Sequence, residues 1–375
     1  MKKTYFLLIL VLLVCSLSSH AQNQETIGQN KLNFAVPDLP AFKALGSEPS
    51  NILRPSTPES FSLIVSQFYN GDNISLPANF AAEIAPWILA KSNKITLADY
   101  HKHDILYSTR VSLGTSRDSL NQYNFAVGLR FSIIDEGDLK NDEEFLKLLF
   151  GKLENHLDKK NDLRIQYMLD HNLLPEEYDA NKEYYEQEIE KLMPGNIDEE
   201  IDAMKKAYKE VYWNREKLDI AVATVGYSTD SLGSDIGFKS FDGWISYALP
   251  IFKMKGESDG SAINPQKYAG QLLLGGNIKA YEHRFDQKTY FNAFLNTRMY
   301  IGTNRIKGFT ELQYSYLQFE ESNHLLMTLG GEINPVDGVW LEFYAGMERN
   351  TDSNLNSSVA KFNLRFSIPE KFNLF

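Results

Sequence analysis

Apolar and polar positions alternate along most of the chain after residue 59. In YNFAVGLRFSI, Tyr123, Phe125 and Val127 share one face, and Asn124 and Arg130 fall on the other. A period of two is typical of a β-strand whose two faces meet different surroundings. Short turn sequences such as GTNR and NPVDG separate the later segments, as in antiparallel hairpins. The pattern predicts twelve strands, at about residues 60–69, 78–89, 104–114, 122–134, 217–228, 240–251, 267–281, 289–302, 308–319, 324–333, 338–348 and 358–368.

The alternation is interrupted over residues 135–216, where charges are dense and apolar residues recur at helical spacing. Asn141 and Glu144 are interpreted as a capping box that opens a first helix. A second helix is predicted from Pro175 to Met193, and a third after the breaker MPGN. Such helices bury their apolar stripes on one another, so the segment is predicted to be a helical insertion between strands four and five. The stripe of the first helix consists of Leu146, Leu149, Leu153 and Leu157.

The first residues of the chain resemble an export signal. Two lysines precede an apolar run over residues 5–14, and Ser19 and Ala21 occupy the −3 and −1 positions of a cleavage site. This is the organisation of a secretory signal peptide. The predicted organisation is therefore a signal peptide (1–21), a proline-rich arm or plug (22–58), strands one to four (59–134), a helical insertion (135–216) and strands five to twelve (217–375).

Charge and composition exclude several function classes. Without residues 1–21 the chain has 36 Lys and Arg against 49 Asp and Glu, a formal charge of −13, which argues against nucleic acid as a partner. The single cysteine, Cys15, lies in the predicted signal peptide, so neither a disulfide nor a thiolate metal site is expected. No run of 18 apolar residues follows the signal, so no transmembrane helix is predicted. No cofactor is predicted.

Twelve alternating strands suit either a soluble sandwich, with the apolar face inward, or a membrane barrel, with that face toward lipid. The apolar faces often extend over five or six positions, which matches the length that a tilted strand needs to cross a bilayer. An even strand number and closure leave no unpaired edge in lipid. We therefore predict a transmembrane β-barrel, with a soluble β-rich binding protein as an alternative. Aromatic residues near strand ends, as at membrane interfaces, are Tyr69, Tyr107, Tyr123, Tyr247, Tyr268, Phe291 and Tyr316.

The signal peptide, the alternating segments and the C-terminal Phe375 together resemble bacterial outer-membrane β-barrel proteins, whose last strand commonly ends in an aromatic residue. The segment LPAFKALGSEPSNILRPSTP, followed by LPANFAAEIAPWIL, is similar to the leaders of uncharacterised barrels. The resemblance implies an integral barrel in the outer membrane, in contact with its lipid. It implies no particular activity.

If the apolar positions face lipid, the opposite parity lines the interior. Arg110 and Arg130 with Glu83 are expected to form one charge ladder between neighbouring strands, and Glu342 with Lys361 and Arg365 a second. Such charges line a selective pore or, paired, fill and stiffen the interior. Large residues of the same parity, among them Trp87, Trp244, Phe294, Tyr300, Trp340 and Tyr344, favour a filled interior. The candidate interior residues are Glu83, Arg110, Arg130, Asp219, Asp242, Arg298, Glu311, Glu342, Lys361 and Arg365.

Catalytic and metal chemistry have little support in the sequence. Twelve-stranded barrel phospholipases use a His and a Ser two residues apart, and no His-x-Ser occurs here, so no enzyme is predicted. HKHD at residues 101–104 supplies two alternate histidines and a carboxylate, which is too few for a metal site without a further ligand. We interpret it as an interfacial polar turn.

An even strand number places both termini in the periplasm, and with them the insertion over residues 135–216. A connection of this length with its own structure is usually functional. We therefore predict an accessory or scaffolding component that engages a periplasmic or outer-membrane protein through the insertion. The alternative is a narrow channel for a small solute.

Overall fold

A computed structural model describes residues 39–46, 69–70, 73–74, 80–91, 95–117, 122–228, 236–253, 268–283, 286–336, 339–352 and 356–366. Its main element is an eleven-stranded antiparallel sheet in which every strand pairs with its neighbours in the chain. A separate hairpin joins β1 (Tyr69–Asn70) and β2 (Asn73–Ile74). The sheet consists of β3 (Ala81–Ile84), β4 (Arg110–Arg117), β5 (Tyr123–Asp135), β6 (Lys217–Ser228), β7 (Ile236–Lys253), β8 (Tyr268–Glu282), β9 (Thr289–Gly302), β10 (Ile306–Leu317), β11 (Ser322–Val336), β12 (Val339–Asn350) and β13 (Asn356–Phe366).

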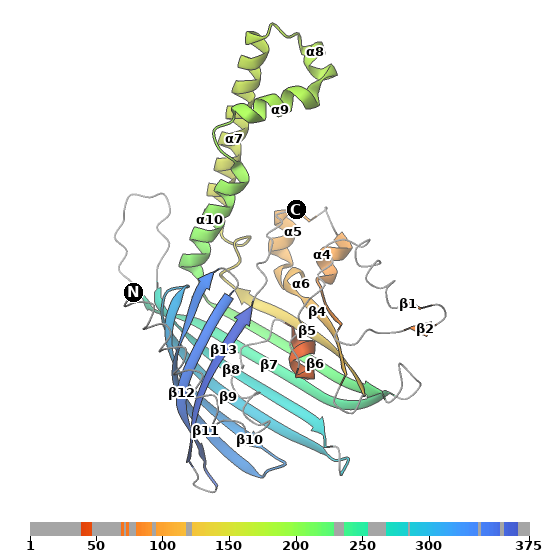
Figure 1. Cartoon of the computed structure of the whole chain (residues 1–375), viewed down its shortest axis with the longest axis vertical. Helices are drawn as coiled ribbons and strands as arrows, with labels where there is room; N and C mark the ends of the chain where they lie inside the picture. Colours follow the sequence, from red (N-terminus) through yellow and green to blue (C-terminus); the bar gives the residue numbers. More distant parts are fainter. Residues whose placement is uncertain are drawn as a thin grey trace, which may run out of the picture.

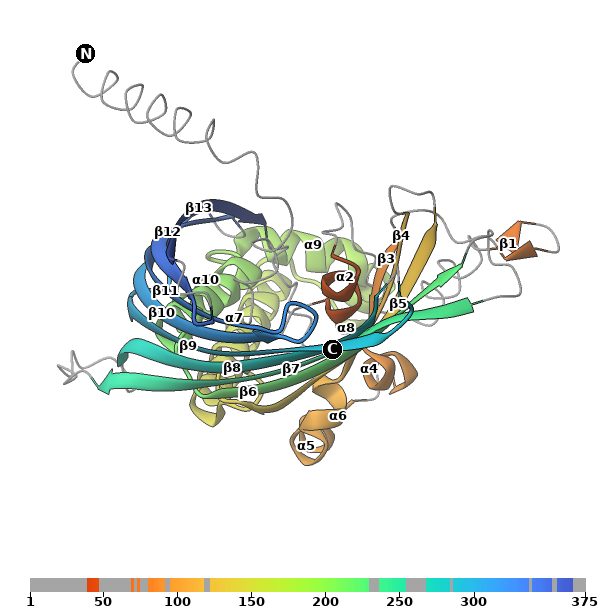
Figure 2. The same ribbon diagram turned by 90° about the horizontal axis from the view of Figure 1, so that it is seen from below.

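The sheet curls into a deep trough, with β3 at one edge and β13 at the other (Figure 2). The prediction of a mostly antiparallel β fold is confirmed. Among the described strands, however, the sheet is open and not closed into the predicted barrel. Apart from Tyr69, the predicted strand at residues 60–69 lies outside the described residues.

Two of the predicted strands are wrong over part of their length, because residues 86–91, 97–102 and 104–108 form three short helices. β3 ends at Ile84, and Pro86 begins α4 (Pro86–Lys91), where the missing N–H of proline costs nothing. α5 (Leu97–Lys102) begins behind Thr96, whose Oγ1 accepts from Asp99 N at 3.2 Å. α6 (Asp104–Ser108) replaces the first half of the strand predicted at 104–114.

Four helices, which we call the stalk, lie between β5 and β6 and project beyond one end of the sheet (Figure 1). Asp142, not the predicted Asn141, caps the first helix, because its Oδ1 accepts from Phe145 N at 2.8 Å. The predicted second helix is two helices that meet at Asn181. Leu157, predicted in the buried stripe, is 58% exposed. The stalk consists of α7 (Glu143–Asp170), α8 (Pro175–Ala180), α9 (Lys182–Leu192) and α10 (Ile197–Tyr212).

The base of the stalk has its own hydrophobic core. Phe145 and Leu149 of α7 are fully buried against Ile201, Tyr208 and Tyr212 of α10. The rings of Phe145 and Tyr208 meet edge to face, with centroids 4.7 Å apart. This packing explains why the first two turns of α7 are amphipathic, whereas its distal half exposes apolar side chains. Within the described residues, no helix is both long and apolar enough to span a membrane.

The sheet is apolar on its exposed face and polar on its concave face. Leu329 is 71% exposed and Leu295 is 63% exposed, whereas Arg298 and Glu311 are almost completely buried. Soluble antiparallel sheets have the opposite arrangement, with apolar side chains on the buried face. The short helix α2 (Pro40–Leu45) lies within the trough, against the concave face of β4 to β7 (Figure 2).

Candidate functional site

Arg298 is the centre of a group of buried charges on the concave face of β9 to β12. Its Nη2 lies 2.6 Å from Oε2 of Glu311, and its Nη1 lies 3.0 Å from Oε1 of Glu342 and 3.4 Å from Oε1 of Glu332. The Tyr300 hydroxyl accepts from Arg298 Nη1 and donates to Glu332, both at 2.9 Å. We call Arg298, Tyr300, Lys307, Glu311, Glu332 and Glu342 the interior charge cluster.

Lys307 adds a second cation to this cluster. Its Nζ lies 3.4 Å from Oε2 of Glu332 and within 5.0 Å of the ring centres of Trp213, Tyr300 and Trp340. A desolvated ammonium group is stabilised by such ring faces as well as by the carboxylate. Because Trp213 follows α10, Lys307 also connects the interior charge cluster to the base of the stalk.

Several buried polar atoms beside the cluster have no hydrogen-bond partner among the described residues. They include both amide atoms of Asn296, Oε1 of Gln313, Oε1 of Glu311 and Oγ1 of Thr328. Asn296 faces Gln313 across β9 and β10, and Glu311 faces Thr328 across β10 and β11. Each unsatisfied buried group costs roughly 1–3 kcal/mol.

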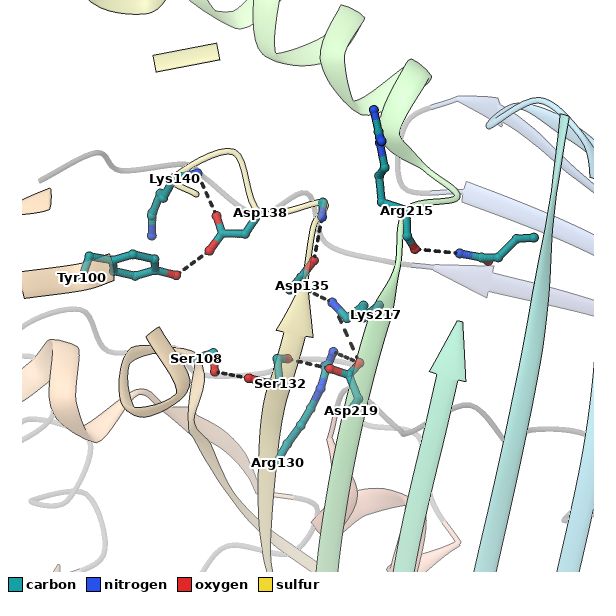
Figure 3. Close-up of polar contacts among 12 residues, drawn as sticks. Tyr100, Ser108, Arg130, Ser132, Asp135, Asp138, Lys140, Arg215, Lys217 and Asp219 are labelled. Carbon is teal, nitrogen blue, oxygen red and sulfur yellow. Dashed lines mark hydrogen bonds and ion pairs between the residues drawn. The ribbon is translucent and has the colours of Figure 1, made fainter. Parts of the chain in front are cut away.

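A second group of ion pairs lies where β5 and β6 approach the stalk (Figure 3). Asp219 lies 3.2 Å from Nη2 of Arg130 and accepts from Ser132 Oγ at 2.6 Å. Lys217 Nζ lies 2.6 Å from Oδ2 of Asp135 and 3.9 Å from Oδ2 of Asp219. Two cations and two carboxylates thus connect the two strands from which the stalk emerges.

Hydrogen bonds extend from this group to the surrounding helices (Figure 3). Ser108 Oγ of α6 donates to the Ser132 carbonyl at 2.9 Å, and the Tyr100 hydroxyl of α5 donates to Asp138. Burial, together with the neighbouring Asp138 carboxylate, raises the pKa of Tyr100. The contacts bind the short helices to the end of β5 and to the start of the stalk.

Asn214 attaches the other side of the stalk to the sheet. Its side chain is completely buried, and Nδ2 donates to the carbonyls of Tyr268 at 2.9 Å and Gly270 at 3.0 Å on β8. Arg305, in the turn between β9 and β10, pairs with Glu210 of α10 at 3.0 Å. The base of the stalk is therefore connected to the sheet both where the chain enters the stalk and where it leaves it.

The distal end of the stalk is held by a carboxylate that binds three partners. Glu186 on α9 accepts from Tyr178 at 2.6 Å and from Arg164 at 2.5 Å, and it lies 3.1 Å from Lys160 Nζ. Burial opposes its ionisation, but hydrogen bonds from Tyr178, Lys160 and Arg164 outweigh burial and lower the pKa of Glu186 to about 2. The ionised carboxylate thus joins α7, α8 and α9.

α2 lies against a part of the concave face where residues with small side chains allow close contact. Ala41 N donates to Ser112 Oγ at 3.1 Å, and Phe42 is 2% exposed. A Cβ at Gly128 would lie 2.6 Å from Ala41 N, and one at Gly114 would lie 2.6 Å from the Phe42 ring. Glycine at these two positions therefore allows the helix to contact the strands.

The residues of the first predicted charge ladder lie on three neighbouring strands, β3, β4 and β5. Arg110 faces Arg130 in the register, and Glu83 faces Ser112. Arg110 Nη1 donates to the carbonyls of Tyr107 and Thr109, while Arg130 pairs with Asp219 on β6. The register therefore sets two arginines opposite each other, and each has partners elsewhere.

The remaining candidates have different surroundings. Asp242, 3% exposed, lies 3.6 Å from Lys279 Nζ. Glu342 faces Asn363 in the register and binds Arg298, three strands away. Lys361 and Arg365 lie opposite Tyr344 and Trp340 on β12, but their side chains are outside the described residues. Trp87, predicted inside, is instead 46% exposed on α4, which corrects that prediction.

Sequence reasoning missed half of the interior charge cluster. Tyr300 was predicted only as one of the large residues that fill the interior. Glu332 was not predicted, although it has the same parity as Thr328 on β11. Lys307 has the parity of Glu311, but it precedes the predicted start of its strand at residue 308. Glu332 lies within the strand predicted at 324–333, and extending the alternation of the next earlier strand by one residue finds Lys307.

The HKHD segment is divided between two helices. His101 lies in the last turn of α5, with Nε2 2.7 Å from the Lys140 carbonyl, and His103 lies at the junction with α6. Within the part of the chain that the structure describes, no three His, Cys, Asp or Glu residues are arranged to hold a metal ion.

Comparisons with known proteins add no relative. No family model, curated protein or solved structure matches this chain.

Proposed function

We propose that this protein is an integral outer-membrane β-barrel protein that acts as an accessory or scaffolding component, with the stalk as the element that engages a partner. In this proposal β3 to β13 belong to a closed wall of about twelve strands. The proposal includes no catalytic activity.

The observation that carries the proposal is the reversed polarity of the sheet. Exposed Leu329, Met327 and Met347 alternate with buried Thr328 and Glu332 and with the tightly packed Gly346. In water, an exposed apolar face of this size has an unfavourable hydration free energy, whereas in a bilayer it removes apolar surface from water. Lipid also requires that strand edges be paired, which favours closure.

A filled interior favours a structural role for the barrel. α2 packs on the concave face of β4 to β7, where Ala41 and Phe42 are buried. On the other half of the trough, Arg298, Tyr300 and Tyr344 are almost completely buried. Paired charges and aromatic side chains of this kind stiffen a small barrel.

The stalk has the features of a docking element. α7 has 28 residues and is about 42 Å long at 1.5 Å per residue. Phe150, Leu157 and Ile165 are exposed along it, within one side of the helix. β13 ends on the stalk side of the sheet, so a barrel whose last strand ends toward the periplasm also has its stalk there.

The membrane part is tested by fractionating cells and by electrophoresis of the purified protein before and after boiling. An integral barrel remains with the outer membrane after carbonate washing and migrates faster unboiled. Release by carbonate, together with unchanged migration, contradicts the proposal and favours a soluble β-rich binding protein.

The scaffolding part is tested by removing the stalk. Glu136 N donates to the Glu216 carbonyl at 3.0 Å, so the two ends of the insertion are adjacent and a short linker can join them. A glycine–serine linker in place of residues 142–211 is expected to leave heat-modifiable migration intact and to abolish crosslinking to the partner. A matched control replaces only the α8–α9 tip, residues 173–193.

A narrow channel is the second candidate, and one observation favours it. Both amide atoms of Asn296 and Oε1 of Gln313 are buried on the concave face without a partner among the described residues, and buried polar atoms of this kind bind water. Flux of small solutes into vesicles that contain the purified protein distinguishes the two functions. Size-dependent flux that persists without the stalk supports the channel, whereas no flux supports the filled scaffold.

A further inference from the structure

The helices α4 and α6 expose apolar side chains outside the trough. Trp87 on α4 is 46% exposed, and Ile105 and Leu106 on α6 are both 41% exposed. The two helices contact each other, so these residues lie on neighbouring elements. Tyr100 of α5 and Tyr107 of α6 stack on each other, with ring centroids 5.5 Å apart, and both are buried. The stacked rings therefore hold α5 against α6.

This pair of helices lies at the end of the sheet from which the stalk projects, and on its convex side (Figures 1 and 2). α6 packs against β5, and Ser108 Oγ binds the Ser132 carbonyl near the end of that strand. On the convex face of the same strand, Val127 is 40% exposed and Ile133 is 38% exposed. The apolar surface of the helices thus continues the apolar outer surface of the sheet.

The described residues of α4 to α6 include two lysines and two carboxylates, and two histidines flank Lys102. His101, Lys102 and His103 are exposed at the junction between α5 and α6. The two acidic residues have local partners. Asp99 Oδ2 lies 4.0 Å from Lys91 Nζ, and Asp104 Oδ1 accepts a hydrogen bond from Ile105 N at 2.7 Å. With both carboxylates engaged locally, Lys102 is an exposed cation beside exposed Trp and aliphatic residues, and this combination is typical of an interfacial membrane helix.

We propose that α4, α5 and α6 form an interfacial platform that binds the anionic phospholipid headgroups of the leaflet on the stalk side. Trp87, Ile105 and Leu106 lie at the boundary between headgroups and acyl chains, and Lys102 lies among the phosphates. The platform rests on the proposed function, since it requires the outer face of the sheet to be in lipid. It fixes the depth and tilt of the barrel and therefore the direction of the stalk.

Depth measurements with spin labels test the platform separately from the barrel. In a chain with Cys15 replaced by serine, single cysteines are introduced by Ile105→Cys, Leu329→Cys and Leu174→Cys, and nitroxide labels are examined in phosphatidylcholine–phosphatidylglycerol nanodiscs. We expect the label at position 105 at headgroup depth, at 329 in the acyl region and at 174 in water. A label at 105 as accessible to aqueous quencher as that at 174, with 329 still in lipid, overturns the platform alone. An aqueous label at 329 overturns the proposed function as well.

A charge variant tests the preference for anionic headgroups. A fluorophore at position 105 is expected to transfer energy more efficiently to headgroup-labelled phosphatidylglycerol than to labelled phosphatidylcholine. Lys102→Gln should reduce this local enrichment by about fivefold. Lys182→Gln, an exposed lysine on the stalk, is the matched control and should leave it unchanged. Equal transfer to the two lipids in the parent protein, or an equal effect of both substitutions, contradicts the proposed role of Lys102.

Discussion

Nη2 of Arg298 on β9 lies 2.6 Å from Oε2 of Glu311 on β10, and the two residues are direct partners in the register. Their side chains are 6% and 0% exposed. The same guanidinium reaches Glu342 on β12 at 3.0 Å, although two strands lie between β9 and β12. It also lies 3.4 Å from Glu332 on β11. One buried cation therefore contacts carboxylates from three strands, β10, β11 and β12, across the curve of the trough.

Replacing Arg298 with methionine removes the cation and leaves Glu311 and Glu342 buried without it. Loss of one partner from a buried ion pair costs about 3–5 kcal/mol, so the free energy of unfolding in detergent should fall by that amount. The measurement is denaturant unfolding followed by tryptophan fluorescence. Arg305→Met is the control, because the pair of Arg305 with Glu210 is exposed and worth at most about 1 kcal/mol. Equal losses in both variants contradict a structural role for the interior charge cluster.

The alternation of the sequence predicted the later strands well because both faces of each are uniform over ten residues or more. It failed over residues 86–89 and 104–108, at the ends of two predicted strands, where the structure has helices instead. There, local signals decide the structure: Pro86 suits a first helical turn, and Thr96 caps α5. The capping pattern located the start of α7 to within one residue, at Asp142 instead of Asn141.

The sequence also predicted which charges belong to the concave face, but not the partners of Arg298. Asp219, Asp242, Arg298, Glu311 and Glu342 are all buried there. Their pairing depends on register and on the curl of the sheet. Alternation carries no signal for either property, so the contact between Arg298 and Glu342 was not predicted.

The close contact between α2 and β5 predicts a specific effect of a single methyl group. In Gly128→Ala, the new Cβ would lie 2.6 Å from Ala41 N, a backbone atom that must then move. Overpacking of this kind costs typically 1–3 kcal/mol, so α2 should detach before the sheet unfolds, at about that cost. Hydrogen exchange of the Ala41 amide, which binds Ser112 Oγ, should accelerate. Gly308→Ala, with its nearest contact at 3.8 Å, is the control, and unchanged exchange in Gly128→Ala sinks the prediction.

The buried amide of Asn214 predicts how firmly the stalk is held. Asn214→Ala removes both hydrogen bonds to β8 and leaves two buried carbonyls without this donor, which should cost about 1–3 kcal/mol. Distances between spin labels on α7 and on β8 should then spread over a wider range. Asn161→Ala, on the exposed side of α7, should leave the distribution narrow. A narrow distribution in both variants means that the pair of Arg305 with Glu210 and the packing at the base are sufficient.

The stalk tip should depend on pH through Glu186. Its pKa in the folded tip is about 2, below the ordinary value of 4.5. A lowered pKa means that ionisation favours the folded form, so this stabilisation is complete above pH about 4.5, declines as the pH falls and is lost below about 2. The protection of α8 and α9 against hydrogen exchange, measured relative to the intrinsic exchange rate at each pH, should therefore decrease between these values, while protection in the sheet strands serves as an internal reference.

Two substitutions assign that pH dependence to one carboxyl group. In Glu186→Gln, the neutral amide cannot form the charged contacts with Lys160 and Arg164, so the tip should already exchange faster at neutral pH. The protection of the tip against exchange, relative to the intrinsic rate, should then change little between pH 4.5 and 2. Glu183→Gln, an exposed position on the same helix, should retain the parent profile. If Glu186→Gln keeps the parent pH dependence, another group at the tip is responsible, and the three-partner contact of Glu186 does not control its stability.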